Sequence, residues 1–388
     1  MLINIDNKKN RLEFILDKIA RDLQLNKSRR EKMESAYKGV SECIENDEEF
    51  FKDIKFEIYP QGSVLIGTTV KPVKEDEYDL DIVVQLIIDW EDKKISPFKV
   101  YNELERVLKA NKTYEEKLEL KNRVLRLNYA GDFHMDIMPG VQENIQNENK
   151  IRIPDKEKRY WKSSNPRGYG SWFEVRCKIE EPFLLEDLYA KAEPIPDQIA
   201  YEAIPPLKRT VQLIKRYRDI YYKDDDELKV SSIILTTVAG QFYKGNNSIV
   251  DSIKNIVDDI YSQFVQYRDN PFEIPNPVNE KENFADKWKD DKRLYESFKK
   301  FITDFKKTWD VVENYQDLNE SKYTLEGLFG ENYVNEAFSL NEKYTKHHLV
   351  NEAENFTKAM SSGSLTLSGI NSEKKYTVQD KGGFYGQI

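Results

Sequence analysis

The sequence predicts an α+β fold in which a lobe with a mixed sheet is followed by a helical C-terminal lobe. Short runs of aromatic and β-branched residues with period-two alternation gather within residues 55–140, as expected of strands. Apolar residues at helical spacing dominate residues 8–47 and 205–315 instead. Several prolines within residues 180–204 mark the junction between the two lobes.

These patterns divide the 388 residues into three segments. Residues 1–200 form the core with its N-terminal helix, and residues 201–360 form the helical lobe. Residues 361–388 are rich in Gly, Ser and Thr, so we expect a mobile tail. The chain is 39% hydrophobic, which is enough for a sizeable core.

Amphipathic helices are expected in and beside the core. The N-terminal region predicts one or two long helices, with two buried stripes formed by Leu12, Leu16, Ile19 and Leu23 and by Met33, Tyr37, Val40 and Ile44. A further helix within residues 91–110 carries Val100, Leu104, Val107 and Leu108.

The stretch from Lys55 to Ile88 carries the first chemical signal. Residues 56–59 read as a strand that Pro60 ends. Gly62 and Ser63 then open a short helix, and the free backbone N–H groups at such a helix start can cradle a phosphate. The sequence therefore predicts a phosphate-binding turn directly after a strand.

Three aspartates are candidates for holding divalent cations. Asp79 and Asp81 lie two residues apart on a predicted strand, so they share one face, while the apolar residues between and after them pack on the other. Asp136 lies on the second strand of a hairpin within residues 123–138. If this strand pairs beside the first, the three carboxylates meet, and they would repel one another unless cations lie among them. Two Mg²⁺ ions held there would serve phosphoryl chemistry.

A strong helix follows Pro205 and Pro206. Its residues Lys208, Gln212 and Lys215 fall on one stripe, which is either a ligand-binding face or a solvated basic face. A second helix, Val230 to Gly240, begins Val-Ser-Ser, where Ser231 can act as a helix cap.

The motifs in this order resemble a known family. QGSVLIGTTVKP, EYDLDIVV and FHMDIMPG are similar to segments of the bacterial cyclic GMP-AMP synthase-like and DncV-like nucleotidyltransferases (CD-NTases) of anti-phage (CBASS) systems. SNPRGYGSWF, LIKRYRD, VSSIILTT and NPVNEKENFADKW extend the resemblance over most of the chain. It implies a polymerase-β-like nucleotidyltransferase lobe, with a long N-terminal helix along the back of both lobes, and a helical nucleotide-binding lobe.

The resemblance also implies an activity and a cofactor. The family makes cyclic oligonucleotide second messengers from NTPs with two Mg²⁺ ions and release of pyrophosphate, and Mn²⁺ is an alternative ion. Asp79, Asp81 and Asp136 match its catalytic metal ligands.

Five residues match nucleotide-binding positions of the family. Gly62 and Ser63, with Gln61 beside them, match the grip on the β- and γ-phosphates, and Lys215 matches a lysine that contacts the triphosphate. Ser232 is the best match to a serine that reaches the nucleotide, and Ser231 is the second. Some relatives have a base-stacking tyrosine after this serine, whereas this chain has Ile233.

Two other residues have both a functional and a structural interpretation. His134 either contacts a nucleotide or is packed within its strand. Residues 141–170 are expected to form a loop and a short helix near the mouth of the site. There Asn165 could read a base edge, and the aromatic side chains either stack on bases or anchor the loop.

Composition limits the partners. The net charge of −9 argues against a broad nucleic-acid-binding surface. Two cysteines and three histidines are too few for a structural zinc site, so we do not expect DNA activation through the zinc-dependent insertion of the animal relatives. RNA activation stays open. We see no signal peptide or long apolar run, which predicts a cytoplasmic protein without a membrane partner.

Three alternatives to a cyclic product remain. The chain could be a nucleotidyltransferase that acts on RNA or a small molecule and makes a linear product. It could be a nucleotide- or RNA-binding module without catalysis. It could also be a scaffold that uses residues 361–388, and some anti-phage relatives have their C-terminus joined to targets or held by a partner protein.

Overall fold

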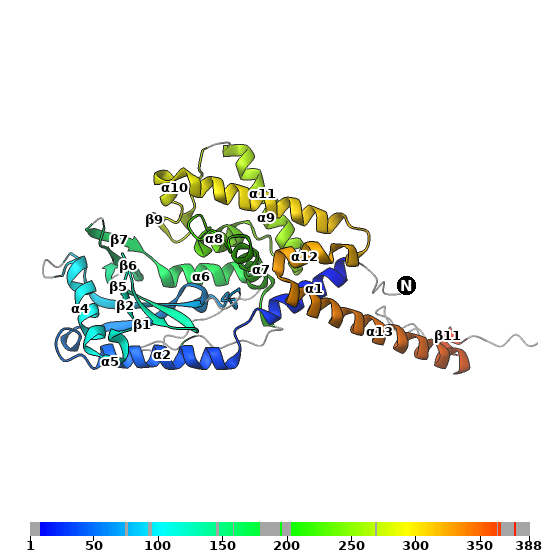
Figure 1. The fold of residues 1–388 in the computed structure, drawn as a ribbon, viewed down its shortest axis with the longest axis horizontal. Helices are drawn as coiled ribbons and strands as arrows, with labels where there is room; N and C mark the ends of the chain where they lie inside the picture. The colour runs from blue at the N-terminus through cyan, green and yellow to red at the C-terminus, as the bar shows by residue number, and fades with distance from the viewer. Residues whose placement is uncertain are drawn as a thin grey trace, which may run out of the picture.

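The computed structural model describes residues 8–73, 77–91, 95–144, 147–157, 159–178, 195, 203–267, 270–362, 364–365 and 376–377. Within this part of the chain, a lobe built on one sheet lies beside a lobe of helices (Figure 1). The predicted α+β class with a mixed sheet is confirmed. None of the described helices combines the length and apolarity that crossing a membrane requires.

The sheet has seven strands in the order β1-β2-β5-β4-β3, and β6 and β7 continue from the far half of β5. β2 and β5 pair in parallel, whereas the other neighbours are antiparallel. The strands are β1 Phe56–Gln61, β2 Tyr78–Asp89, β3 Leu118–Leu120, β4 Leu125–Tyr129, β5 Phe133–Asn144, β6 Asn147–Asp155 and β7 Tyr160–Ser164.

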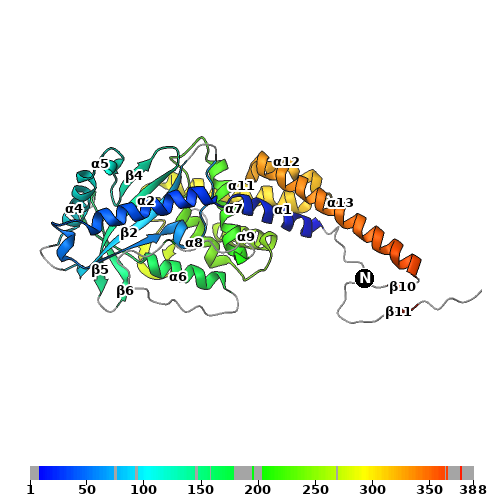
Figure 2. The same ribbon diagram turned by 90° about the horizontal axis from the view of Figure 1, so that it is seen from below.

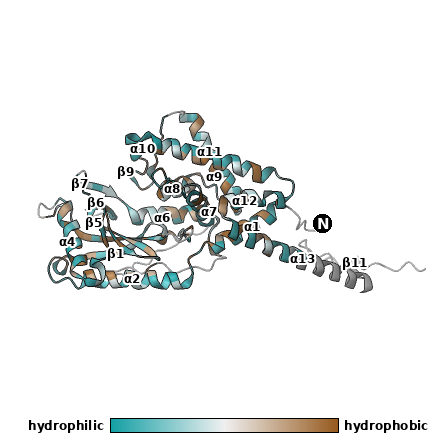
Figure 3. Cartoon of the chain, in the orientation of Figure 1, coloured by the Kyte–Doolittle hydropathy of each residue, from teal (hydrophilic) through white to brown (hydrophobic). Residues whose placement is uncertain are grey.

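One face of the sheet is the core of its lobe. Leu80, Ile82 and Val84 of β2 have no exposed surface, as their alternation with the aspartates predicted. They pack in one cluster with the predicted stripes of α2 (Lys27–Glu45) and α4 (Pro97–Ala110). The strands near β1 are mostly brown in Figure 3, and α2 mixes teal and brown, as expected of a helix with one buried face.

Two expectations about strands are wrong. Pro60 lies inside β1 and not after it. It is tolerated because, among the described strands, β1 pairs only with β2 and lies at the edge of the sheet. Residues 147–164 form β6 and β7 instead of a loop. Ile151 and Ile153 alternate and are buried, but the many Asn and Lys residues around them obscured this short strand pattern.

The N-terminal region forms two helices, α1 (Lys8–Asp22) and α2, one after the other along both lobes (Figure 2). The buried stripe of α1 packs in the core of the helical lobe, whereas that of α2 packs under the sheet. Asn26 begins α2, and its side chain accepts a hydrogen bond from the N–H of Arg29 at 2.9 Å. The chain's first helices therefore connect the two lobes.

The helical lobe is built around an aromatic core. Its fully buried residues include Phe298, Phe301, Phe305 and Trp309 on one face of α11. The remaining helices are α3 Gly62–Leu65, α5 Lys112–Glu115, α6 Pro166–Cys177, α7 Pro206–Tyr221, α8 Ser232–Phe242, α9 Ile249–Tyr267, α10 Lys287–Asp290, α11 Lys292–Asn314, α12 Lys322–Phe329 and α13 Glu331–Ser362, with short 3₁₀ turns at Phe51–Asp53 and Leu318–Ser321. The long α13 extends away from the body of the molecule (Figure 1).

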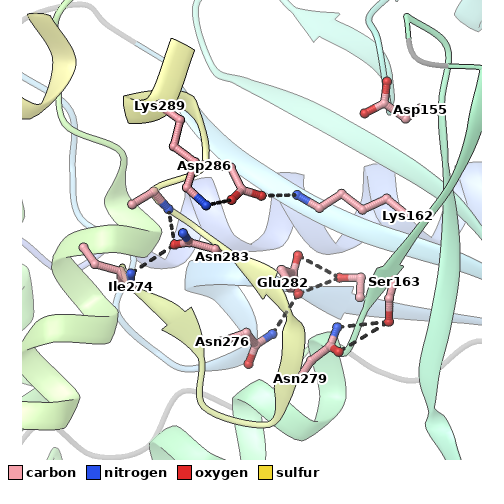
Figure 4. Close-up of polar contacts among 12 residues, drawn as sticks. Asp155, Lys162, Ser163, Ile274, Asn276, Asn279, Glu282, Asn283, Asp286 and Lys289 are labelled. Carbon is pink, nitrogen blue, oxygen red and sulfur yellow. Dashed lines mark hydrogen bonds and ion pairs between the residues drawn. The ribbon is translucent and has the colours of Figure 1, made fainter. Parts of the chain in front are cut away.

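A hairpin joins the helical lobe to the sheet. The segment NPVNEKENFADKW, with the residue before it, contains β8 (Pro275–Asn276) and β9 (Asn279–Asn283), which we did not predict. Asn279 donates from Nδ2 to Ser163 Oγ of β7 at 3.1 Å, and the buried Glu282 accepts from Asn276 Nδ2 at 2.8 Å. Figure 4 shows these hairpin side chains directed toward β7. The hairpin therefore anchors one lobe on the other.

Two predicted segments lie wholly or mostly outside the described residues. The junction prolines Pro182, Pro194 and Pro196 are not among them. Of the predicted tail, the structure describes the end of α13 and a short antiparallel pair, β10 (Ser364–Leu365) with β11 (Tyr376–Thr377).

Candidate active site

The sheet register brings two of the predicted carboxylates together. In the parallel pair of β2 and β5, Asp81 lies opposite Asp136, and Asp79 lies opposite His134. On the other side of β2, Gln61 of β1 lies opposite Asp81. The pairing of Asp136 beside the Asp79–Asp81 strand, on which the predicted site depends, is therefore present in the fold.

The predicted phosphate-binding turn adjoins this strand. Gly62 has a φ of +60°, a backbone conformation that favours glycine, and it begins the four-residue α3. A Cβ at this position would lie only 2.4 Å from Asp81 Oδ2. The turn that carries Ser63 can therefore approach the carboxylate of Asp81 closely because residue 62 has no side chain.

Arg126 is a site residue that we did not predict. It lies on β4 opposite Asp136 and donates from Nε to Oδ1 at 2.7 Å and from Nη2 to Oδ2 at 2.8 Å. Its Nη2 is also 3.7 Å from Asp79 Oδ1. The hydrogen bonds to Asp136 raise the pKa of Arg126. A signal existed in the sequence, because Leu125 and Leu127 point into the core and place Arg126 on the opposite face.

The electrostatics of the site favour a cation. Burial, together with the nearby charges of Asp79 and Asp136, raises the pKa of Asp81 to about 8. A positive ion among these carboxylates would relieve both the desolvation and the mutual repulsion.

The carboxylates of the three aspartates suit divalent cations, but the guanidinium of Arg126 competes for one of them. Carboxylate oxygens are the ligands that Mg²⁺ prefers, and the strand register supplies them. Among the described residues, however, no three acidic, His or Cys side chains are arranged closely enough to hold a metal ion. Arg126 occupies both oxygens of Asp136, so a cation bound at Asp136 has to compete with that guanidinium.

Lys215 extends from the helical lobe toward the site, where its ammonium group donates hydrogen bonds to Thr68. Its Nζ donates to the carbonyl oxygen of Thr68 at 3.2 Å and to Thr68 Oγ1 at 3.0 Å. Burial, with the nearby Arg218 charge, lowers the pKa of the Lys215 ammonium to about 7. Lys208 and Gln212 are buried as well, so the interpretation of this stripe as a solvated basic face is wrong.

Ser232 lies at the first position of α8, and its Oγ accepts a hydrogen bond from the guanidinium of Arg218. Ser231 is the N-cap residue, but its side chain makes no capping hydrogen bond. The serine pair is therefore next to an arginine that also bonds Asp219, with Nε 2.9 Å from Oδ1.

Three further candidates have local partners. Nδ1 of His134 is 2.9 Å from Oε2 of Glu77, and Gln61 Nε2 is 3.9 Å from the sulfur of Met138.

Asn165 is the N-cap of α6, and its amide accepts from the N–H of Gly168 at 3.0 Å and donates to the carbonyl of Val278 at 3.1 Å. Asn165 therefore caps α6 and joins it to Val278, and its reading of a base edge stays a prediction.

Comparison with known proteins gives the family. The Second Messenger Oligonucleotide or Dinucleotide Synthetase domain matches residues 12–176. A c-di-GMP synthase of Roseivirga ehrenbergii is 39% identical over 332 residues, which is 85% of this chain and 87% of that protein. The cyclic dinucleotide synthase CdnG of Bradyrhizobium diazoefficiens is 26% identical over 83% of this chain and 81% of its own length.

The fold agrees with these sequence relationships. A solved structure of the B. diazoefficiens CD-NTase CdnG in complex with GTP superposes with a TM-score of 0.69 at 22% identity, and the match covers 85% of this chain and 98% of that one. Because the relative that is 39% identical matches most of both chains, this chain belongs to the CD-NTase family of cyclic oligonucleotide synthases, which are nucleotidyltransferases.

Proposed function

We propose that this chain joins two GTP molecules into cyclic di-GMP, with Asp79, Asp81 and Asp136 as its catalytic residues. The product is inferred from the c-di-GMP synthase that is 39% identical over most of both chains. The observation that carries the site is the parallel register of Asp81 with Asp136, directly beside the Gly62 turn. This arrangement combines a carboxylate cluster with a phosphate-binding turn.

The three aspartates would hold two Mg²⁺ ions, or Mn²⁺ in their place. Such ions would lower the pKa of the attacking hydroxyl and neutralise the negative charge of the leaving pyrophosphate. Asp136 would help to remove the proton from the ribose hydroxyl while the ribose oxygen forms its bond to the α-phosphorus. The bond from that phosphorus to the bridging oxygen breaks, and pyrophosphate leaves. In the linear intermediate, the free ribose hydroxyl then attacks the remaining α-phosphorus, which closes the ring and releases a second pyrophosphate.

The phosphate contacts come from both lobes. The Ser63 hydroxyl and the backbone at Gly62 would hold the β- and γ-phosphates, with Gln61 beside them. Lys215 and Ser232 approach from the helical lobe. Because Lys215 already bonds Thr68, we infer that it both supports the phosphate-binding turn and provides positive charge next to it.

The biological setting follows from family membership. We assign the chain to an anti-phage system of the cytoplasm, with its C-terminal tail as the segment that a partner protein of the same system would hold. Deletion of residues 361–388 should then leave product synthesis unchanged and abolish only partner binding.

Product analysis tests the proposed function. The full chain is incubated with labelled GTP, ATP and MgCl₂, treated with phosphatase, and analysed by mass spectrometry after nuclease digestion. We expect a phosphatase-resistant cyclic product with GTP alone. A linear product would instead support a terminal nucleotidyltransferase, and no product from any NTP would support a non-catalytic binding module.

The site assignment is tested with matched aspartate variants. Asp81→Ala should abolish synthesis and leave the melting temperature near that of the wild type. Asp226→Ala, in the exposed acidic loop of the helical lobe, should be fully active. Normal synthesis by Asp81→Ala would refute the assignment.

A further inference from the structure

Thr69 folds back onto the residue that would grip the phosphates. Its Oγ1 donates a hydrogen bond to Ser63 Oγ at 3.1 Å. The neighbouring Thr68 donates from its backbone N–H to the carbonyl oxygen of Ser63 at 2.9 Å. Two consecutive residues therefore hold both the backbone and the side chain of Ser63.

The bond from Thr69 decides what the Ser63 hydroxyl can still do. A serine hydroxyl has one hydrogen to donate and lone pairs that accept. Because its oxygen accepts from Thr69, its own hydrogen points away from Thr69, and no acceptor within the described part of the chain takes it. The hydroxyl is therefore prepared as a donor, which is what an anionic phosphate oxygen requires.

Thr69 is itself held by a buried amide of the helical lobe. Gln212 of α7 has no exposed surface and donates from Nε2 to the carbonyl oxygen of Thr69 at 3.1 Å. Its Oε1 accepts from Gln24 Nε2 at 2.8 Å, and Gln24 lies in the turn that follows α1. Because a buried amide left unpaired is unfavourable, this chain of hydrogen bonds resists rearrangement.

We propose that Thr69 is a positioning residue for triphosphate binding, which orients the Ser63 hydroxyl as a hydrogen-bond donor to the substrate's phosphates. The proposal rests on the proposed function and deepens it. Thr69 does not touch the substrate itself. It acts through Ser63, and Gln212 with Gln24 keeps it in place from the other lobe.

A double-mutant cycle separates this role from a merely structural one. GTP affinity of the full chain is measured by calorimetry with MgCl₂ for the wild type, Ser63→Ala, Thr69→Val and the double variant. Loss of one neutral hydrogen bond should weaken GTP binding by Thr69→Val about fivefold. In the Ser63→Ala background, the same substitution should have no further effect, because the hydroxyl that it orients is gone.

Conservative variants serve as controls. Thr69→Ser keeps the hydroxyl and should restore wild-type affinity and KM. Thr303→Val removes a comparable half-buried hydroxyl, whose Oγ1 donates to the carbonyl of Lys299 at 2.7 Å on α11, and it should leave GTP binding unchanged. Melting curves verify folding, and Thr69→Ala replaces Thr69→Val if the latter melts early.

Two results would overturn the inference. Equal losses of GTP affinity from Thr69→Val in both backgrounds would show that Thr69 acts independently of Ser63. A wild-type chain that binds no NTP at all would overturn the proposed function together with this inference, so the two failures are distinguishable.

Discussion

Replacement of Gly62 by alanine tests the contact between the phosphate-binding turn and Asp81. The substitution adds one methyl group in a backbone conformation with φ of +60°, which costs about 1–2 kcal/mol for a residue with a Cβ. The new Cβ would also lie 2.4 Å from Asp81 Oδ2, so either the carboxylate or the turn has to move by about 1 Å to reach an ordinary contact distance.

The expected consequence is a loss of rate that exceeds the loss of stability. A misplacement of about 1 Å at a reacting centre lowers rates by roughly 10²-fold. We therefore expect Gly62→Ala to make cyclic product about 10²-fold more slowly than the wild type. Initial rates are measured by chromatography of the nucleotide products, and stability is measured by thermal melting.

Gly131→Ala is the matched control. Gly131 has a φ of +78°, so alanine there has a similar backbone strain, but a Cβ would meet no atom within 4 Å. The backbone N–H of residue 131 that donates to Glu77 Oε1 at 2.7 Å is retained. This variant should lose similar stability and keep its activity. If Gly62→Ala were within about threefold of Gly131→Ala in rate, the contact with Asp81 would be irrelevant to catalysis.

Four further outcomes are expected. Arg126→Gln removes the cation that occupies Asp136, so Mn²⁺ should bind about tenfold more tightly in the absence of nucleotide, measured by electron paramagnetic resonance; weaker binding would contradict the competition. Because the pKa of Asp81 is raised to about 8 and protons compete with metal for its carboxylate, Mg²⁺ affinity should rise from pH 6 to pH 8 and then level off, as calorimetry can check. Lys215→Met should raise the KM for GTP about tenfold with a smaller change in kcat, whereas an unchanged KM would exclude its phosphate role. Phe301→Ala empties a fully buried site in the helical core and should lower the free energy of unfolding by about 3–5 kcal/mol in denaturant titrations.

Some features of the site follow from local sequence alone. Side chains on a strand alternate, so Asp79 and Asp81 had to share one face once the intervening apolar residues were buried. Helical periodicity likewise predicted the buried faces of α1, α2 and α4. These patterns repeat over two to four residues, and burial of an apolar face is the dominant force that selects them.

Other features depend on contacts between distant segments. The ion pair of Arg126 with Asp136 requires the β4–β5 register, and the bond of Lys215 with Thr68 requires the docking of two lobes. Helical periodicity alone also left a solvated basic face as an interpretation of the stripe that contains Lys215. The stripe is buried instead, because other segments of the chain supply the hydrogen-bond acceptors that a buried cation requires. β6 escaped prediction since its polar residues become stable in a strand through pairing with β5 and β7.

By itself, the sequence determined the carboxylate pair, the glycine turn and the helical faces, because each depends on the conformation of neighbouring residues. Only the tertiary structure decided which groups meet these residues, namely Arg126 at Asp136 and Thr69 at Ser63. A hydrogen-bond partner is selected by geometry within a few tenths of an ångström, and such geometry arises only when segments far apart in the chain are packed together.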